Sequence, residues 1–288
     1  MINLKKHLFY LFFGLCHFKA ISQELASDSI ISPKKVTLKL DIQSRYIWRG
    51  QSWGGNYFVI QPTVEYKANK KMTLGVWATT NFKKDYFYND GSFYKGYQEF
   101  DMYLIYNVNK YMSVQLWDYY WPSVKKVEGI DNGFFNYGKN SVKTIDFNLL
   151  FDFSEVWLPF TTTISTLIAG NDYRYDVLGK NPKQNFTTYA EVGYTFEDVL
   201  KKTNNKVMRN ITVSPTAGMV FNNQAKYYVS GDYNKPSLVN LSLEMVKEFE
   251  LAKQLNLPIS LVFTHNATIQ NTQMFGRNFL IFGANLTY

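Results

Sequence analysis

The amino-acid sequence predicts an all-β protein, a closed antiparallel transmembrane β-barrel of about twelve strands. The first reason is an alternation of apolar and polar residues, which recurs from Val36 to Tyr288 in segments long enough to cross a bilayer at a tilt. The second is the gathering of aromatic residues at the ends of these segments. The third is a last segment that finishes on an aromatic residue, Tyr288. A soluble β-sandwich would scatter its aromatic rings, so the barrel is favoured.

The start of the chain has the pattern of a secretory signal peptide. Lys5 and Lys6 precede an apolar run from Leu8 to Leu15, and Ala20-Ile21-Ser22 places small residues where a signal peptidase cleaves. The run is too short to span a membrane as a helix. We therefore expect three segments: a signal peptide at 1–22, a periplasmic lead-in at 23–35 and an outer-membrane β-barrel at 36–288.

The only cysteine, Cys16, lies inside the expected signal peptide. Its removal leaves a chain without thiols, which suits export into an oxidising compartment. A lipoprotein anchored at Cys16 is the alternative, and the bulky Leu15 before it disfavours that interpretation. The formal charge of +8 comes from basic residues spread along the chain, so the sequence does not indicate binding to nucleic acid.

The opening segment, Val36–Gly50, sets the pattern that the other strands repeat. Its apolar face ends in aromatic residues and consists of Val36, Leu38, Leu40, Ile42, Tyr46 and Trp48. Charged residues occupy the opposite face. The other strands are expected at 57–68, 72–79, 97–108, 111–120, 144–152, 157–169, 186–196, 210–221, 237–249, 257–267 and 278–288.

Short and long connections alternate between these strands. Asn69-Lys70 and Asn109-Lys110 are tight turns, whereas 81–96 and 121–140 are long. In barrels of the outer membrane the short turns face the periplasm and the long loops face outward. An even number of strands then places both termini on the periplasmic side. The connection 197–209 is an exception to the short periplasmic turns because it is long and basic, and the sequence does not indicate its role.

Aromatic residues on the expected lipid-facing side form two belts, one at each end of the strands. The belt near the short turns consists of Tyr66, Tyr106, Phe151, Tyr194, Phe249 and Tyr288. The belt near the long loops consists of Trp48, Phe58, Phe100, Phe186 and Phe221. The terminal aromatic of the last strand is the form that the barrel-assembly machinery recognises in many outer-membrane proteins, so we expect that machinery as a partner.

Several motifs in the first part of the chain resemble one family. Residues 44–52, Ser-Arg-Tyr-Ile-Trp-Arg-Gly-Gln-Ser, are similar to the opening S-x-Y-x-x-R-G-x-S of the TorF-type porins, also known as Gcw-type conserved hypothetical proteins. Residues 75–81 resemble their G-x-W segment before an Asn, 99–103 their E-x-D-x-Y, and 119–122 their aromatic-Pro strand end. Ile105 stands where that family usually has Gly. The resemblance implies an outer-membrane barrel of porin type, with its solute undefined.

The polar face of the predicted strands would line the barrel interior, and its charged residues are the candidate site. Our predicted pore-lining set is Arg45, Arg49, Glu65, Glu99, Asp101, Asp146, Glu191 and Glu244. Arg45 and Arg49 lie on one strand face, and Glu99 and Asp101 are expected at a similar depth. One hypothesis is therefore a basic side opposite an acidic side, which would orient small polar solutes at a constriction. The alternative is that these charges pair with one another and plug the lumen.

The sequence therefore predicts a porin-like channel in a bacterial outer membrane, for passive diffusion of small polar or ionic solutes. A closed barrel with a structural or adhesin-like role through loops 82–96 and 121–140 is the alternative. An outer-membrane lipid-modifying enzyme is the third class, and its candidate is His265, the only histidine after removal of the signal peptide. No Ser lies two residues from His265, so we predict no catalytic site.

Metal and cofactor chemistry have little support in the sequence. There is no HExxH, no cysteine pair, no P-loop and no Gly-rich dinucleotide turn. The triplets Asn89-Asp90-Gly91 and Asp131-Asn132-Gly133 could hold calcium, but such triplets are more often plain turns. We predict no cofactor and no metal. The expected partners are the lipid bilayer and small polar solutes.

Overall fold

The computed structural model describes residues 35–83, 96–124, 128–154, 158–203, 209–222, 225, 228, 236–252, 255–268 and 276–288. The predicted signal peptide at 1–22 and nearly all of the lead-in at 23–35 lie outside these residues and stay predictions. So do most of loop 82–96 and the triplet Asn89-Asp90-Gly91. Among the described residues, no helix is both long and apolar enough to cross a membrane.

Twelve strands form one closed antiparallel barrel, as the sequence predicts. The wall consists of β1 (Val36–Gln43), β4 (Val59–Lys67), β5 (Met72–Thr80), β6 (Gln98–Asn107), β7 (Met112–Tyr120), β8 (Lys143–Asp152), β9 (Phe160–Gly170), β12 (Thr188–Tyr194), β13 (Ile211–Val220), β14 (Ser237–Ala252), β15 (Leu255–His265) and β16 (Asn278–Thr287). Two short hairpins lie outside the wall: β2 (Tyr46–Trp48) with β3 (Gln51–Trp53), and β10 (Tyr173–Arg174) with β11 (Lys183–Gln184).

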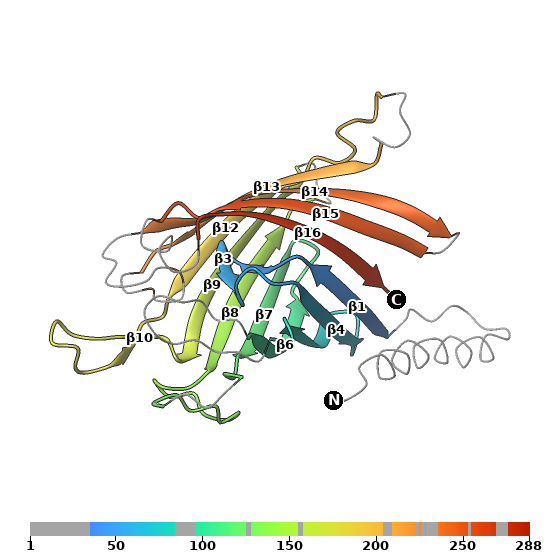
Figure 1. Ribbon diagram of the computed structural model, residues 1–288. Coiled ribbons are helices and arrows are strands. Elements are labelled where there is room, and N and C mark those ends of the chain that lie inside the picture. The colour runs from blue at the N-terminus through green and yellow to red at the C-terminus, as the bar shows by residue number, and fades with distance from the viewer. Residues whose placement is uncertain are drawn as a thin grey trace. The chain divides into compact units, whose positions relative to one another are not determined.

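The barrel closes where the first wall strand meets the last. β1 pairs with β16 in the register Lys39↔Thr287 to Gln43↔Gly283, and Figure 1 shows β16 in red near β1 in blue. Leu38 and Tyr288 exchange both backbone hydrogen bonds, at 3.0 and 2.8 Å. The final residue is therefore paired, and the sheet has no free edge. Because the number of wall strands is even, the chain enters and leaves the barrel at the same end.

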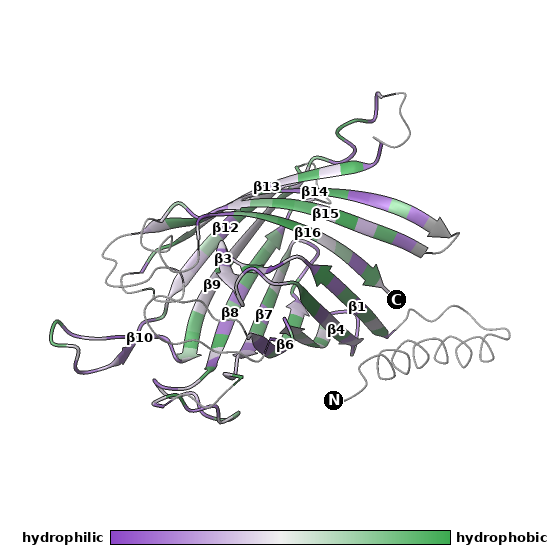
Figure 2. Ribbon diagram, in the orientation of Figure 1, coloured by the Kyte–Doolittle hydropathy of each residue, from purple (hydrophilic) through white to green (hydrophobic). Residues whose placement is uncertain are grey.

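The two faces of the wall differ in polarity, as the alternation predicts. On β4, Val64 is 42% exposed on the outside, whereas its neighbour Thr63 is 7% exposed and points inward. Figure 2 shows this alternation as green and purple bands along the strands. Large apolar side chains cover the outside, among them Leu74, Met102, Leu116, Ile164, Val192, Leu243, Phe263 and Phe282. This outer surface and the closed sheet define a transmembrane β-barrel.

Eight of the eleven residues in the predicted aromatic belts are confirmed as exposed on the outer surface near strand ends: Tyr66, Tyr106, Phe249, Tyr288, Phe58, Phe100, Phe186 and Phe221. Phe151 and Tyr194 are half-buried at the ends of β8 and β12. Trp48 is the exception, because the expected strand Val36–Gly50 leaves the wall after Gln43. Tyr46 and Trp48 belong to the separate β2–β3 hairpin and contact residues of the barrel interior, so their assignment to the lipid face was wrong.

The tight turns are built by asparagine side chains. Asn69 accepts hydrogen bonds from the backbone N–H groups of Lys71 and Met72 at 2.8 and 3.0 Å, and Asn109 accepts one from Tyr111 at 2.8 Å. These are side-chain turns that favour a short connection. The long connection 197–209 stays close to the barrel at its start, since the backbone N–H of Val199 donates to the carbonyl of Ile211.

Candidate functional site

The β2–β3 hairpin forms because two consecutive residues adopt positive φ angles. Arg49 has φ +47° and Gly50 has φ +85°, and they connect Trp48 to its partner Gln51 in a two-residue turn. Positive φ at both central residues is the type I′ geometry, whose twist matches that of paired strands. Gly adopts this conformation freely, whereas for Arg it costs about 1–2 kcal/mol of conformational free energy. The contacts of the Arg49 side chain must therefore outweigh that cost.

The hairpin reaches from one wall of the barrel to the opposite wall. It is connected to β1 and β4, which are neighbours in the sheet, while Arg49 contacts β8 and β9, which lie about half-way round the ring. Its tip also touches a third part of the wall. The Asn266 side chain donates to the carbonyl oxygen of Gly50 at 3.1 Å, and a Cβ atom on Gly50 would lie 1.9 Å from the carbonyl oxygen of Val239. The hairpin therefore crosses the lumen.

The Arg49 guanidinium fastens the hairpin to the far wall. Nη2 donates to Asp146 and Asn148 of β8 at 3.0 and 3.1 Å. Nη1 donates to Ser165 of β9 and to the hydroxyl of Tyr228 at 2.7 and 2.6 Å. Planar guanidinium groups suit such a set because their donors are fixed in direction. We call Arg49, Asp146, Asn148, Ser165 and Tyr228 the arginine latch.

The arginine latch is buried and its charges are satisfied. The Arg49 side chain is 14% exposed and that of Asp146 is fully buried. Asp146 also accepts hydrogen bonds from Ser165 at 2.6 Å and Tyr119 at 3.0 Å. Removing one member of a buried ion pair typically costs about 3–5 kcal/mol, because the other charge stays buried without its partner. The latch thus joins the hairpin to the wall through a buried ion pair and hydrogen bonds.

Aromatic rings pack around the latch. Trp48 of the hairpin stacks on Tyr228 with ring centroids 5.1 Å apart, and Tyr228 stacks on Tyr189 of β12 at 5.4 Å. The Arg49 guanidinium lies 4.8 Å from the ring centroids of both Trp48 and Tyr189. Tyr228 belongs to the connection between β13 and β14, so a residue of that connection also takes part in the packing around Arg49. Ring faces attract a cation, which adds to the hold on Arg49.

Two carboxylates of the predicted set lie on β6, on another side of the hairpin. Glu99 accepts a hydrogen bond from the Tyr97 hydroxyl at 2.8 Å, and Asp101 accepts one from the backbone N–H of Tyr120 at 3.2 Å. Tyr46 lies in the hairpin and Tyr97 directly precedes β6. Burial and the nearby Glu99 raise the pKa of both tyrosine hydroxyls. Both hydroxyls therefore keep their protons and act as donors near Glu99.

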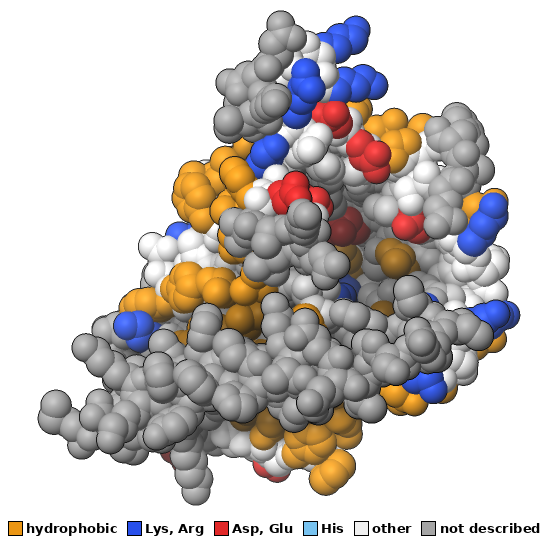
Figure 3. Space-filling model, turned by 90° about the vertical axis from the view of Figure 1, so that its right-hand side faces the viewer, with side chains coloured by type: hydrophobic (Ala, Val, Ile, Leu, Met, Phe, Trp, Pro, Cys, Tyr) orange, Lys and Arg blue, Asp and Glu red, His pale blue; other side chains and the backbone are white. Residues whose placement is uncertain are grey.

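The other predicted residues lie at different places around the interior. Glu65 forms an ion pair with Lys39 at 3.1 Å and accepts a hydrogen bond from Tyr103 at 2.8 Å. Glu191 accepts a hydrogen bond from Asn240 at 3.0 Å. Glu244 is half-buried on β14. Seen from the end at which the chain terminates, acidic side chains gather in and around a hollow (Figure 3).

The structure pairs neither of the two arginines with Glu99 or Asp101. Arg49 is paired with Asp146 instead, and Arg45 donates to Asn56 within its own loop while its guanidinium lies 5.4 Å from the Phe279 ring centroid. The reason is that both arginines leave the wall with the hairpin after Gln43. As a pore-lining set, the eight residues remain a prediction.

The sequence reasoning missed most members of the latch. Asn148, Ser165 and Tyr228 are uncharged and were not considered as site residues. The one available signal was Arg49-Gly50, a dipeptide that suits a turn with positive φ, followed by Gly54-Gly55. Partners so far apart in the chain come together only through the closed sheet, which no local pattern reports.

The remaining candidates have ordinary structural roles. His265 lies with Nδ1 2.7 Å from the Asn278 side-chain oxygen, a cross-strand contact between β15 and β16. Asp131 accepts a hydrogen bond from the backbone N–H of Gly133 at 2.8 Å, which makes that triplet a side-chain turn. Among the described parts of the chain, no three His, Cys, Asp or Glu residues lie close enough together to hold a metal ion.

Comparison with known proteins shows similarity at the level of fold. No protein-family model matches the chain, and no curated protein matches it. Among solved structures, the NanC porin is similar with a TM-score of 0.48 and 7% identity, over 87% of this chain and 98% of the porin. LpxR from Salmonella typhimurium is similar with a TM-score of 0.46 and 8% identity, over 88% of this chain and 99% of LpxR. The class of protein rests on this chain's own strand pairing and outer surface.

Proposed function

We propose that this protein is a porin-like channel of a bacterial outer membrane, through which small polar or ionic solutes diffuse passively. The closed wall with an apolar outside and charged residues inside supports this function. This closed, charged interior is the observation that carries the proposal, and the hairpin held across it by the arginine latch would limit the width of the passage. A segment held across a barrel of this size makes a narrow constriction rather than a wide pore.

The proposed orientation places the tight turns at Asn69 and Asn109 and both ends of the barrel domain in the periplasm. The last strand would then enter the membrane from the side on which the barrel-assembly machinery acts. The hairpin follows the first wall strand, so it would lie toward the outer opening. Solutes from outside would meet the constriction before the acidic hollow of Figure 3.

We also propose that the chain is a member of the TorF-type porin family. The motif residues that carry the resemblance have roles in the interior, which supports the proposal. In the first motif, Ser44 closes the pairing of β1 with β16, Arg49 forms the latch, and Gly50 forms the hairpin tip. In the second, a Cβ atom on Gly75 would lie 2.1 Å from the Tyr103 ring.

Recording from the folded protein in a planar bilayer tests the proposed channel. We expect discrete current steps of low conductance, because the hairpin leaves only a narrow passage. Electrophoresis with and without boiling provides the folding control, since a closed barrel migrates differently before heating. A heat-shifting preparation that never conducts would contradict the channel and favour a closed barrel.

The closed barrel with a binding role is the second candidate, and the latch itself favours it. The four N–H groups on Nη1 and Nη2 of Arg49 all donate to acceptors within the protein, as in a permanently filled interior. The absence of conductance together with binding of a small molecule to the interior would support this alternative.

The position of the bilayer can be tested with a pair of charges on β14. We expect Leu243→Arg to lower the stability of the folded barrel by about 2–4 kcal/mol, because Leu243 is exposed on the outer surface, where lipid would surround it. Glu244→Arg is the matched control, since the neighbouring side chain points inward and should tolerate a charge. Unfolding by denaturant in lipid vesicles measures both variants. Equal losses would contradict the assignment of the two faces.

A further inference from the structure

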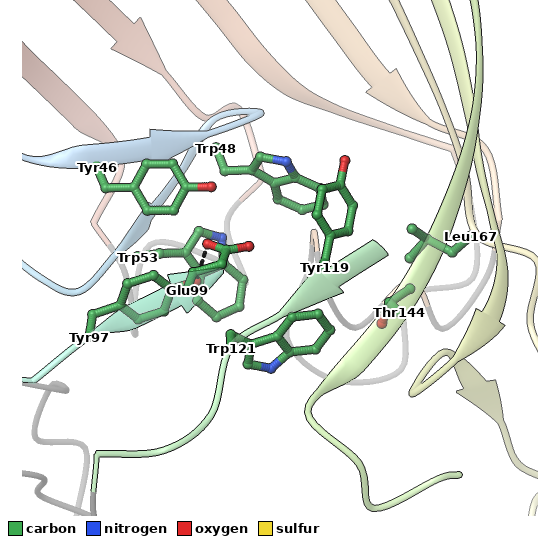
Figure 4. Close-up of a pocket in the computed structure, with 9 residues that line it drawn as sticks. All are labelled: Tyr46, Trp48, Trp53, Tyr97, Glu99, Tyr119, Trp121, Thr144 and Leu167. Atoms are coloured by element: carbon green, nitrogen blue, oxygen red, sulfur yellow. Dashed lines mark hydrogen bonds between the residues drawn. The ribbon is translucent and has the colours of Figure 1, made fainter. Parts of the chain in front are cut away.

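A small pocket lies between the hairpin and the wall strands β6 to β9 (Figure 4). Six aromatic side chains line it: Tyr46, Trp48, Trp53, Tyr97, Tyr119 and Trp121. Figure 4 shows the Glu99 carboxylate among these rings, with its hydrogen bond to Tyr97 drawn as a dashed line. Aromatic walls around one acid are the features that bind an organic cation, since ring faces and carboxylate both attract positive charge.

Neither of the two buried carboxylates at this pocket, Glu99 and the nearby Asp101, forms an ion pair within the described parts of the chain. Glu99 is 8% exposed and Asp101, two residues further along β6, is 2% exposed. The ion pairs that the described residues form are Lys39–Glu65, Arg49–Asp146 and Lys143–Asp118, none of which includes either acid. A buried carboxylate with neutral donors alone is held at a cost that a bound cation would remove.

The same chain already holds one of its own ammonium groups in this kind of surrounding. The Lys143 Nζ, at the start of β8, lies 3.8 Å from the ring centroid of Phe134 and 5.1 Å from that of Tyr137. It forms an ion pair with Asp118 at 2.7 Å and its side chain is fully buried. Lys143 precedes Thr144, which lines the pocket at Glu99. An ammonium group is therefore compatible with rings and a carboxylate in this part of the barrel.

The Glu99 carboxylate selects among cations. It can accept a hydrogen bond from an N–H group, which a primary alkylammonium ion has and a quaternary ammonium ion lacks. We propose that the pocket binds the head group of a small primary alkylammonium ion, with one N–H donated to Glu99 and the remaining charge facing the rings. A tetramethylammonium ion or a neutral sugar cannot make both contacts, because the first has no N–H group and the second has no charge. Binding here does not require that the ion crosses the barrel, so the inference goes beyond the proposed channel.

Calorimetric titration of the folded full-length barrel in detergent with methylammonium chloride tests this inference. We expect saturable binding of methylammonium, with tetramethylammonium, sodium and glucose each binding more weakly. Glu99→Gln should weaken methylammonium binding by about ten- to a hundred-fold, the range for a hydrogen bond to a charged group. Glu244→Gln is the matched control, because it removes an interior carboxylate outside the pocket and should leave the affinity unchanged.

The titration can overturn the inference in three ways. Binding of tetramethylammonium as tight as that of methylammonium would contradict the hydrogen bond to Glu99. Equal affinity in wild type and Glu99→Gln, or an equal loss in Glu244→Gln, would show that the interior attracts cations without this pocket. The absence of methylammonium binding beyond that of sodium would exclude it. If Glu99→Gln fails the boiling-shift test for folding, Trp121→Leu, which removes a ring just beyond β7, replaces it with the same expected loss.

Discussion

Replacing Arg49 with alanine is expected to raise the single-channel conductance of the barrel severalfold. The substitution removes four hydrogen bonds and the ion pair that hold the hairpin tip against β8 and β9. Alanine keeps the cost of the positive φ that Arg49 adopts in the turn but lacks the contacts that outweigh this cost. The hairpin would then be held by its two ends at Gln43 and Val59 and by the uncharged contacts of Trp48 and Gly50, and the segment that crosses the lumen could move aside. Planar-bilayer recording measures the change.

Arg45→Ala provides the matched control for that experiment. Arg45 is in the same loop and carries the same charge, but its guanidinium contacts Asn56 and the Phe279 ring rather than the opposite wall. We therefore expect the conductance of Arg45→Ala to stay near that of the wild type. A conductance that rises equally in both variants would mean that lumen charge, and not the latch, sets the current. No change in either would mean that the remaining contacts of the tip, at Val239 and Asn266, suffice to hold it.

The wall of the barrel could be predicted from the sequence because its rules are local. Side chains alternate between lipid and interior with a period of two, and Asn69 and Asn109 mark tight turns at one end. These features determine the number of strands and the outward face. The closing pair, Leu38 with Tyr288, then follows from an even number of strands in a closed sheet.

The hairpin could not be predicted in the same way because it is itself made of strands. The alternation continues through Ser44 to Trp48 although the chain leaves the wall at Gln43, so the pattern does not indicate where the wall strand ends. The usual hairpin signal is Asn-Gly or Asp-Gly, and Arg49-Gly50 is not one of these. The placement of Glu99 and Asp101 on one face of one strand could be predicted, because it depends only on the alternation of neighbouring residues. The pairing of Arg49 with Asp146 depends on where the hairpin tip meets the far wall, which is a property of the whole barrel.

The two members of the buried ion pair are expected to differ in how much their loss costs. Arg49→Leu leaves Asp146 with hydrogen bonds from Ser165 and Tyr119, so the remaining carboxylate is still partly satisfied. Asp146→Leu leaves the Arg49 charge with neutral acceptors only, in a site that excludes water. We expect Asp146→Leu to lower the free energy of unfolding by about 3–5 kcal/mol and Arg49→Leu to lower it by less.

The double variant Arg49→Leu/Asp146→Leu separates the cost of an unpaired charge from the loss of the contact itself. Because neither charge remains, we expect it to be more stable than Asp146→Leu alone, with a coupling of about 1–3 kcal/mol between the two sites. Unfolding of all four proteins by denaturant in vesicles measures the cycle, and current recording shows in which of them the hairpin is released. Losses that simply add would indicate that Arg49 is held by the Trp48 and Tyr189 rings rather than by Asp146. A stable double variant that conducts strongly would instead show that the ion pair positions the hairpin and is not needed for the stability of the barrel wall. A constriction inside a rigid barrel requires this arrangement.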